Sequence, residues 1–146
     1  MFVNTSKAIG IDDIIEIERK INLVLPKQLV KHYIKYNGGI PEKRFLYSCI
    51  SDIETSVQTF LSMKYKNEIG YTLEDMYLHF VNKNVIPKKY VPFACDAGSN
   101  LFCIDVETGK IVIVWMDMGE VNESMIPVLS NSFDEFIDSL EEDEEI

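Results

Sequence analysis

The segment from Tyr90 to Met116 limits what this chain can fold into more than any other stretch. It contains two runs of β-branched and aromatic residues, LFCIDVE and KIVIVWM, on either side of Thr108-Gly109. A two-residue turn ending in glycine between two such runs is typical of a β-hairpin. The register that follows pairs Glu107 with Lys110, Val106 with Ile111, Ile104 with Ile113, and Phe102 with Trp115.

One face of this hairpin is uniformly large and apolar. Because side chains alternate across a strand, that face carries Phe102, Ile104, Val106, Ile111, Ile113 and Trp115. The opposite face is apolar at its open end and charged near the turn. We therefore expect a central hairpin, covered fully on one side and partly on the other, with Trp115 in a structural role.

The size of the chain suits one compact domain. Its 146 residues are 47% hydrophobic, enough for a core that needs neither metal nor disulfide. No apolar run is long enough to cross a bilayer, and residues 1–10 lack the pattern of a signal peptide. The three cysteines, Cys49, Cys95 and Cys103, have no ligand spacing. We expect them to be buried free thiols in a protein of the reducing cytoplasm.

Charge divides the chain into two unequal parts. Residues 1–90 hold 13 basic and 10 acidic side chains, whereas residues 91–146 hold Lys110 and 14 acidic side chains. Such acidity disfavours nucleic acid and anionic membranes as partners, because phosphate contacts need lysine and arginine. A basic protein partner is favoured instead, although acidity also serves solubility alone.

Periodicity predicts five helices and a further strand. A helix is expected from Asp12 and Asp13, with Asp13 and Glu16 at capping-box spacing, and another from Pro26 to the Asn37-Gly38-Gly39 end. A strand is expected over Phe45–Ile50, and three further helix starts follow it in the sequence. They are a helix opened by Ser51 and Glu54, a helix capped by Thr72, and a helix opened by Ser132 and Glu135.

Three other features complete the expected organisation. The extended piece between Pro87 and Pro92 is expected at a sheet edge or strand start. Lys27, Lys31 and Lys35 form a stripe that we interpret as a solvated surface. A single domain over residues 1–140 is followed by an acidic tail, residues 141–146, that we expect to be disordered.

Three ordered motifs carry a family resemblance. They are L-P-x-x-L-x-x-x-Y-x-x-Y-N-G-G from Leu25 to Gly39, V-P-F-A-x-D-x-G-x-N-x-F-C-I-D from Val91 to Asp105, and G-K-x-x-x-x-W-x-D from Gly109 to Asp117. Together with the last acidic-aromatic helix, they resemble the SUKH superfamily. That family joins a fungal cell-wall assembly regulator to many bacterial immunity proteins.

The resemblance implies both a fold and a function. The expected fold is α+β, a single domain with a mixed or antiparallel β-sheet flanked by helices. The expected function of a bacterial member is to bind and neutralise a polymorphic toxin, often a nuclease. Ala97 departs from the family's usual second glycine in the turn, which affects the subfamily and not the fold.

The residues suggest no catalytic set, metal site or cofactor. No Ser-His-Asp or Cys-His set suggests itself, and neither a G-x-x-x-x-G-K-[ST] nor a G-x-G-x-x-G loop is present in the sequence. Asp96, Asp105 and Asp117 imitate a carboxylate metal site, but Asp96 and Asn100 are more simply turn residues that bond nearby backbone groups. His32 and His79 have no ligand partner at suitable spacing and are interpreted as structural or exposed.

Three hypotheses for function follow. The first is an immunity protein that occludes a basic toxin, and the second is a non-enzymatic regulatory or scaffolding module. The third is a hydrolase that uses the three aspartates with a divalent ion. For the first, the expected partner-binding residues are Asp117, Glu120, Glu123, Asp52, Glu54 and Asp96. The first three share one polar loop after the central hairpin, where a rigid sheet can present them.

Overall fold

The computed structural model describes residues 1–66, 70–116, 124 and 126–142. Its helices are α1 (Ile11–Ile21), α2 (Lys27–Lys35), α3 (Leu73–Asn82) and α4 (Phe133–Ser139). Its first strands are β1 (Phe2–Val3), β2 (Ile40–Pro41), β3 (Phe45–Ser48), β4 (Ile53–Ser56) and β5 (Thr59–Phe60). The later strands are β6 (Tyr90–Cys95), β7 (Leu101–Asp105), β8 (Ile111–Val114) and β9 (Val128–Ser130).

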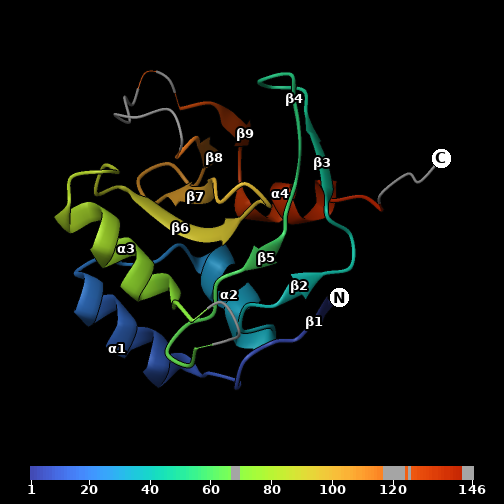
Figure 1. Cartoon of the computed structure of the whole chain (residues 1–146). Coiled ribbons are helices and arrows are strands. Elements are labelled where there is room, and N and C mark those ends of the chain that lie inside the picture. Colours follow the sequence, from blue (N-terminus) through green and yellow to red (C-terminus); the bar gives the residue numbers. More distant parts are fainter. Residues whose placement is uncertain (67–69, 117–123, 125, 143–146) are drawn as a thin grey trace.

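A five-stranded antiparallel sheet in the order β5-β6-β7-β8-β9 organises the molecule. Two small antiparallel pairs, β1–β2 and β3–β4, lie outside it. Figure 1 shows α1, α2 and α3 on one side of this sheet and the β3–β4 hairpin projecting away from them. The α+β fold expected from the resemblance is confirmed. No described helix has both the length and the apolar character needed to cross a membrane.

Both faces of the central hairpin are covered, as predicted. Phe102, Ile104, Ile111 and Ile113 belong to the main core, which all four helices line. On the opposite face, Leu101, Cys103, Val112 and Val114 form a second cluster with Ile86 and Tyr90. Trp115 is half-buried against the main core, in keeping with a structural role.

The predicted hairpin register is wrong by two residues. Ile104 faces Ile111, and Phe102 faces Ile113. Asp105 N–H donates to the carbonyl of Lys110, so the connection has four residues, 106–109, and not two. The Asp105 carboxylate accepts the N–H groups of Glu107 and Thr108, which stabilises this longer loop. A shift of two residues preserves the faces, and the predicted core face therefore holds.

Aromatic side chains join the last helix to the sheet. Phe93 on β6 lies 5.3 Å from Phe133 and 5.6 Å from Phe136, ring centroid to centroid, with edge-to-face geometry. Phe102 approaches Phe136 at 5.8 Å. All four rings are buried. Each such ring contributes about 1.5–3 kcal/mol through burial, which explains how a seven-residue helix stays docked.

Four of the five predicted helices are present, and one of them has a different cap. Thr72 and Ser132 accept the N–H groups of Asp75 and Glu135, as their spacing predicts. The first helix uses a different pair. Gly10 is its N-cap and donates its N–H to Asp13, so the predicted Asp13–Glu16 capping box is wrong.

The predicted helix after Ser51 is wrong, because residues 53–60 form strands. Ile53, Thr55 and Val57 turn inward, while Glu54 and Ser56 are exposed, which is strand periodicity. Asp52, with φ 54°, lies in the left-handed turn between β3 and β4. The Ser51 hydroxyl donates to the carbonyl of Val128 and caps no helix.

Two further expectations about the sheet and the chain's end also change. Pro92 lies on β6, which is an inner strand and not an edge strand, because it runs between β5 and β7. β5 pairs only with Ala94 and Cys95 and ends before it reaches Pro92. A register shift between Pro92 and Ala94 accommodates the missing N–H. At the other end of the chain, Glu141 exchanges two backbone hydrogen bonds with Phe45, and residues 143–146 lie outside the described residues.

Candidate functional site

The β3–β4 hairpin presents two of the predicted partner-binding acids on an exposed surface. Asp52 lies in its turn and Glu54 on β4, opposite Tyr47 in the register. Tyr47 and Ile50 are 51% and 49% exposed beside them. We call Tyr47, Ile50, Asp52 and Glu54 the hairpin surface. It combines an aromatic ring, an aliphatic side chain and two carboxylates.

The hairpin surface is held in a defined geometry by hydrogen bonds. The Tyr47 hydroxyl donates to Asp52 Oδ1 at 2.8 Å, and this bond raises the pKa of Tyr47. Beneath it, the buried Ser48 hydroxyl donates to the carbonyl of Leu129 at 2.8 Å. With the Ser51–Val128 bond, these contacts fix the hairpin to β9.

Asp96 has a local structural role in the turn between β6 and β7. Its Oδ1 accepts the N–H groups of Gly98 and Asn100, both at 2.9 Å, and Asn100 Nδ2 donates to Oδ2. Asn100 Oδ1 in turn accepts the N–H of Met116 at 2.9 Å. The predicted turn role of Asp96 and Asn100 is confirmed. Both carboxylate oxygens of Asp96 are engaged, so a partner would have to compete with these bonds.

Asp117, Glu120 and Glu123 lie outside the described residues. The residues that flank this loop are described. Met116 is tied to Asn100 on one side, and Val128 is tied to Ser51 on the other. Met116, Ile126 and Val128 also pack against the second apolar cluster. The Ser51 bond therefore places one flank of the acidic loop, at Val128, next to the β3–β4 hairpin, whereas the other flank, at Met116, is held by the turn between β6 and β7.

The proposed set of three metal-binding aspartates does not form. Asp96 and Asp105 lie beyond opposite ends of β7. At about 3.3 Å per residue, a carboxylate beside Asn100 and one at Asp105 are separated by about 17 Å. Asp105 is 6% exposed, and its Oδ2 lies 3.9 Å from the Lys89 ammonium. Over the described ranges, no group of three or more acids, histidines or cysteines is arranged to hold a metal ion.

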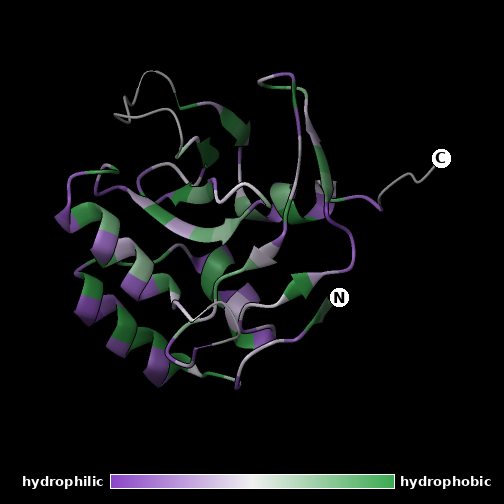
Figure 2. Cartoon of the chain, in the orientation of Figure 1, coloured by the Kyte–Doolittle hydropathy of each residue, from purple (hydrophilic) through white to green (hydrophobic). Residues whose placement is uncertain are grey.

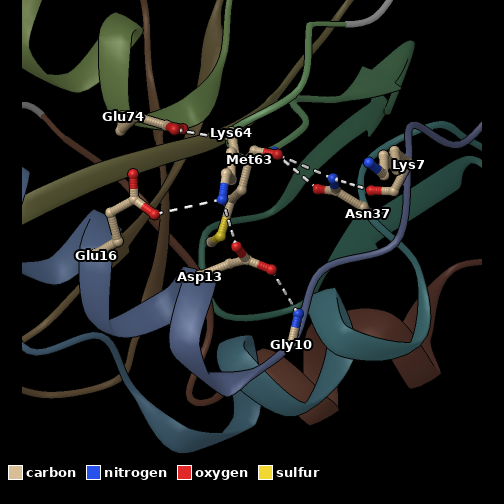
Figure 3. Close-up of polar contacts among 8 residues, drawn as sticks. All are labelled: Lys7, Gly10, Asp13, Glu16, Asn37, Met63, Lys64 and Glu74. Carbon is tan, nitrogen blue, oxygen red and sulfur yellow. Dashed lines mark hydrogen bonds and ion pairs between the residues drawn. The ribbon is translucent and has the colours of Figure 1, made fainter.

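Polar side chains around Lys64 join the loop after β5 to helices α1 and α3 (Figure 3). Lys64 Nζ lies 2.6 Å from Asp13 and 3.3 Å from Glu16 on α1, which raises the pKa of Lys64. The backbone N–H of Lys64 donates to Glu74 on α3. Burial raises the pKa of Glu74, whose side chain is largely enclosed. Every group named here bridges two elements, so the cluster acts as a structural junction.

Asn37 of the Y-N-G-G motif belongs to this junction (Figure 3). Asn37 donates from Nδ2 to the carbonyls of Lys7 and Met63, and its Oδ1 accepts the N–H of Met63. Helix α2 already ends at Lys35, with Tyr36 in an extended conformation. The helix therefore ends directly before Asn37, but its C-cap is the extended Tyr36 and not the predicted left-handed residue. The motif also brings two chain segments together.

The cysteines differ in exposure. Cys103 is buried and its pKa is raised by burial, whereas Cys95 is half-buried. Cys49 is exposed, which corrects the expectation that all three are buried. It lies in the turn that follows β3, and the predicted strand to residue 50 is therefore two residues too long.

Sequence analysis missed Tyr47 and Ile50 as surface residues. The sequence gives no signal for Tyr47, because it follows two other apolar residues and precedes a polar serine; only the structure shows it exposed between buried Leu46 and buried Ser48. Ile50 gives no signal either, since its exposure depends on a turn at the position where the sequence predicts the start of a helix.

These features define a small α+β protein built on a five-stranded antiparallel sheet. The chain matches the model of the SMI1 / KNR4 family (SUKH-1) over residues 9–139. It belongs to that family, a group that includes immunity proteins and whose members are generally non-catalytic.

A short stretch is also similar to a named bacterial protein. It is 33% identical over 54 residues to the SPbeta prophage-derived uncharacterized protein YokK of Bacillus subtilis (strain 168). The matched stretch covers 37% of this chain and 28% of that protein.

Proposed function

We propose that this protein is an immunity protein that binds one cognate toxin and blocks it by occlusion. The hairpin surface is the observation that supports this function most directly. Tyr47 and Ile50 offer apolar contact area, and Asp52 and Glu54 flank it with negative charge. Buried aromatic groups supply much of the energy of protein interfaces, whereas charges mainly speed encounter and select the partner.

The proposed partner is a basic protein domain of the nuclease type. The acidic balance of residues 91–146 complements a basic cleft that evolved to hold nucleic acid. Asp117, Glu120 and Glu123 extend the interface in this proposal, because Val128, which follows their loop, is bonded to Ser51 of the β3–β4 hairpin. In this proposal Asp96 also contributes negative charge to the interface, while its carboxylate holds the turn between β6 and β7.

Binding alone accounts for this function. A stoichiometric inhibitor needs no catalytic residue and no cofactor, and membership in a generally non-catalytic family supports the same conclusion. The proposal includes a cytoplasmic location, where the protein would protect the cell that makes the toxin.

Capture and titration test the proposal. The protein is cross-linked in its native host, the bound protein is identified, and that protein's toxic domain is purified and assayed. We expect a basic toxin whose activity falls linearly and ends at an equimolar amount of this protein. A partner without toxic activity would instead favour the regulatory or scaffolding role.

Paired variants locate the interface. Tyr47→Ala should weaken inhibition by roughly tenfold or more, as expected for an aromatic residue at the centre of an interface. Tyr71→Ala is the matched control, because Tyr71 is 57% exposed on a different part of the molecule. Equal inhibition by both variants would exclude the hairpin surface as the contact.

A further inference from the structure

An open apolar groove lies between α1 and α2 on the outside of the molecule. Its volume is about 430 Å³. Ile11 and Ile15 line it from α1, Val30 and Ile34 line it from α2, and Val24 lines it from the connecting loop. Figure 2 shows hydrophobic bands along the ribbon of α1, next to hydrophilic ones.

The aliphatic side chains of this groove are exposed although their helices are well anchored. Ile11 is 56% exposed, Ile15 40%, Val24 81% and Ile34 37%. The core contacts of the two helices are made by other residues, among them Ile14, Ile17, Leu29 and Tyr33. Among described residues, nine large hydrophobic side chains are exposed, and four of them gather here. Clustered exposure of this kind marks an interaction site, whereas single exposed residues do not.

The charge of the groove indicates the chemistry of its occupant. Lys27 and Lys31 line the α2 wall, and Lys35 follows one turn later. On the α1 wall, Glu18 accepts the N–H of Leu25 at 2.7 Å and so holds the connecting loop. The apolar floor is therefore bordered by a row of positive charge. An occupant with an apolar face and an acidic flank complements both features.

We propose that the α1–α2 groove binds an amphipathic helix of a partner protein, apolar on one face and acidic along its flank. The eleven residues of α1 give the groove a length of about 16 Å, which suits roughly three turns of such a helix. Apolar residues at positions i, i+3, i+4 and i+7 would fill it. In this proposal Lys27, Lys31 and Lys35, which we interpreted from the sequence as a solvated surface, attract the acidic flank of the partner helix.

This surface is distinct from the hairpin surface. Figure 1 shows α1 and the β3–β4 hairpin at opposite ends of the molecule. A helix in the groove therefore leaves the hairpin surface open. The inference does not depend on the proposed immunity function.

A pair of synthetic peptides tests the groove. The first is a fluorescein-labelled helical peptide of about three to four turns, with leucine at i, i+3, i+4 and i+7 and glutamate at the flanking positions. The second has lysine in place of every glutamate. We expect the full-length protein to bind the acidic peptide at least roughly tenfold more tightly by fluorescence anisotropy, with a preference that shrinks as salt rises.

Variants assign the binding to the groove. Ile15→Glu should weaken binding of the acidic peptide by roughly tenfold or more. Lys27→Glu/Lys31→Glu should reverse the preference between the two peptides. The matched control is Lys43→Glu/Lys110→Glu, which changes the net charge equally at exposed lysines that do not line the groove. Circular dichroism melting verifies that each variant is folded.

Three results would overturn the proposal. One is equal binding of both peptides, and another is equal loss in the groove and control variants. The third is a different occupant. Sedimentation with vesicles containing anionic lipid, lost in Ile15→Glu, would assign the groove to a membrane surface. Concentration-dependent dimerisation, lost in the same variant, would assign it to a second copy of this chain.

Discussion

The backbone conformation and surroundings of Gly38 explain why this residue is a glycine. Its φ is +74°, and a Cβ atom there would lie 2.9 Å from both the backbone N and Cα of Ser62. Gly38→Ala should therefore destabilise the protein by about 1–3 kcal/mol more than conformational strain alone. Gly109→Ala is the control, since Gly109 has φ +79° and an added Cβ atom would meet nothing within 4 Å. Urea unfolding of both variants provides the comparison, and equal losses would contradict the close approach.

His32 makes stability depend on pH. Burial among aromatic rings, with smaller contributions from Lys35 and the N-terminus, lowers its pKa from 6.5 to about 4. Because the unfolded chain binds this proton more readily, the stabilising contribution is complete above pH 6.5 and is lost as pH falls toward 4. His32 should thus account for about 2 kcal/mol of lost stability between about pH 8 and pH 5.

A matched pair of variants isolates the effect of His32. His32→Phe preserves an aromatic ring and removes the titrating group, so its unfolding free energy should vary less with pH over that window. His79→Phe is the control, because His79 is exposed. Denaturant titrations at each pH measure the difference. Identical pH profiles for the two variants would show that His32 is not held neutral.

Single residues were predictable where their partners are local. The Asp96 turn, the Thr72 cap and the Ser132 cap each involve contacts within four residues, so the sequence displays both partners. The exposure of Ile11 and Ile15 was not predictable in this way. Helical periodicity gives the direction of each side chain around the axis of α1, but the position of α2 decides which of these side chains are buried.

At the scale of elements, the segment from Ser51 to Phe60 has the local sequence pattern of a helix but forms strands because of contacts with distant residues. Ser51 and Glu54 have capping-box spacing, and the apolar residues that follow suit either period. The strand is formed because Ser48 and Ser51 donate to β9, about 80 residues away in the chain. Contacts at that separation leave no mark in a short window of sequence. The hairpin surface was therefore predicted only through its charges.

The hairpin register provides a prediction for the sheet. Ile104 and Ile111 face each other and are almost fully buried. Ile104→Ala or Ile111→Ala should cost about 2–5 kcal/mol of unfolding free energy, through lost transfer energy and a residual cavity. Chemical denaturation measures each loss. Losses below about 1 kcal/mol at both positions would contradict a shared core face.

A double-mutant cycle distinguishes the observed register from the one expected from the turn. With Ile→Val substitutions, coupling should be larger for Ile104 with Ile111 than for Ile104 with Ile113, because facing residues are closer than diagonal ones. Larger coupling between Ile104 and Ile113 would instead support the two-residue turn predicted from the sequence. Sequence analysis identified both strands and both faces. It missed the register because the bond from Gly109 to Asp105 lengthens the loop.

At the scale of the whole molecule, charge and shape separate two surfaces of opposite character. The lysine-bordered groove belongs to α1 and α2, in the part of the chain with a balance of +3. The β3–β4 hairpin, which carries the hairpin surface, is bonded through Ser51 to Val128, and Val128 belongs to the part of the chain with a balance of -13. Sequence alone revealed the imbalance. Only the fold shows that the acids of the hairpin, which belong to the basic part of the chain, lie on a hairpin that is bonded to β9 in the acidic part.

The last prediction separates a local contact from the effect of net charge. Asp52→Lys/Glu54→Lys should slow association with the captured toxin by roughly tenfold at low salt, because opposite charges steer encounter. At about 1 M salt, where the screening length is about 3 Å, the difference from wild type should shrink. Both positions are exposed, so the fold should persist.

The control for that variant changes net charge by the same amount elsewhere. Glu42→Lys/Glu107→Lys alters two exposed acids, one in the β2–β3 connection and one in the β7–β8 loop. Stopped-flow kinetics over a range of salt compares the two proteins. If the hairpin surface is the contact, the control changes the association rate much less, because screening confines each charge to about 10 Å at 0.1 M salt. Equal slowing would show that the toxin responds to overall acidity, and the interface would then be expected on the C-terminal helix.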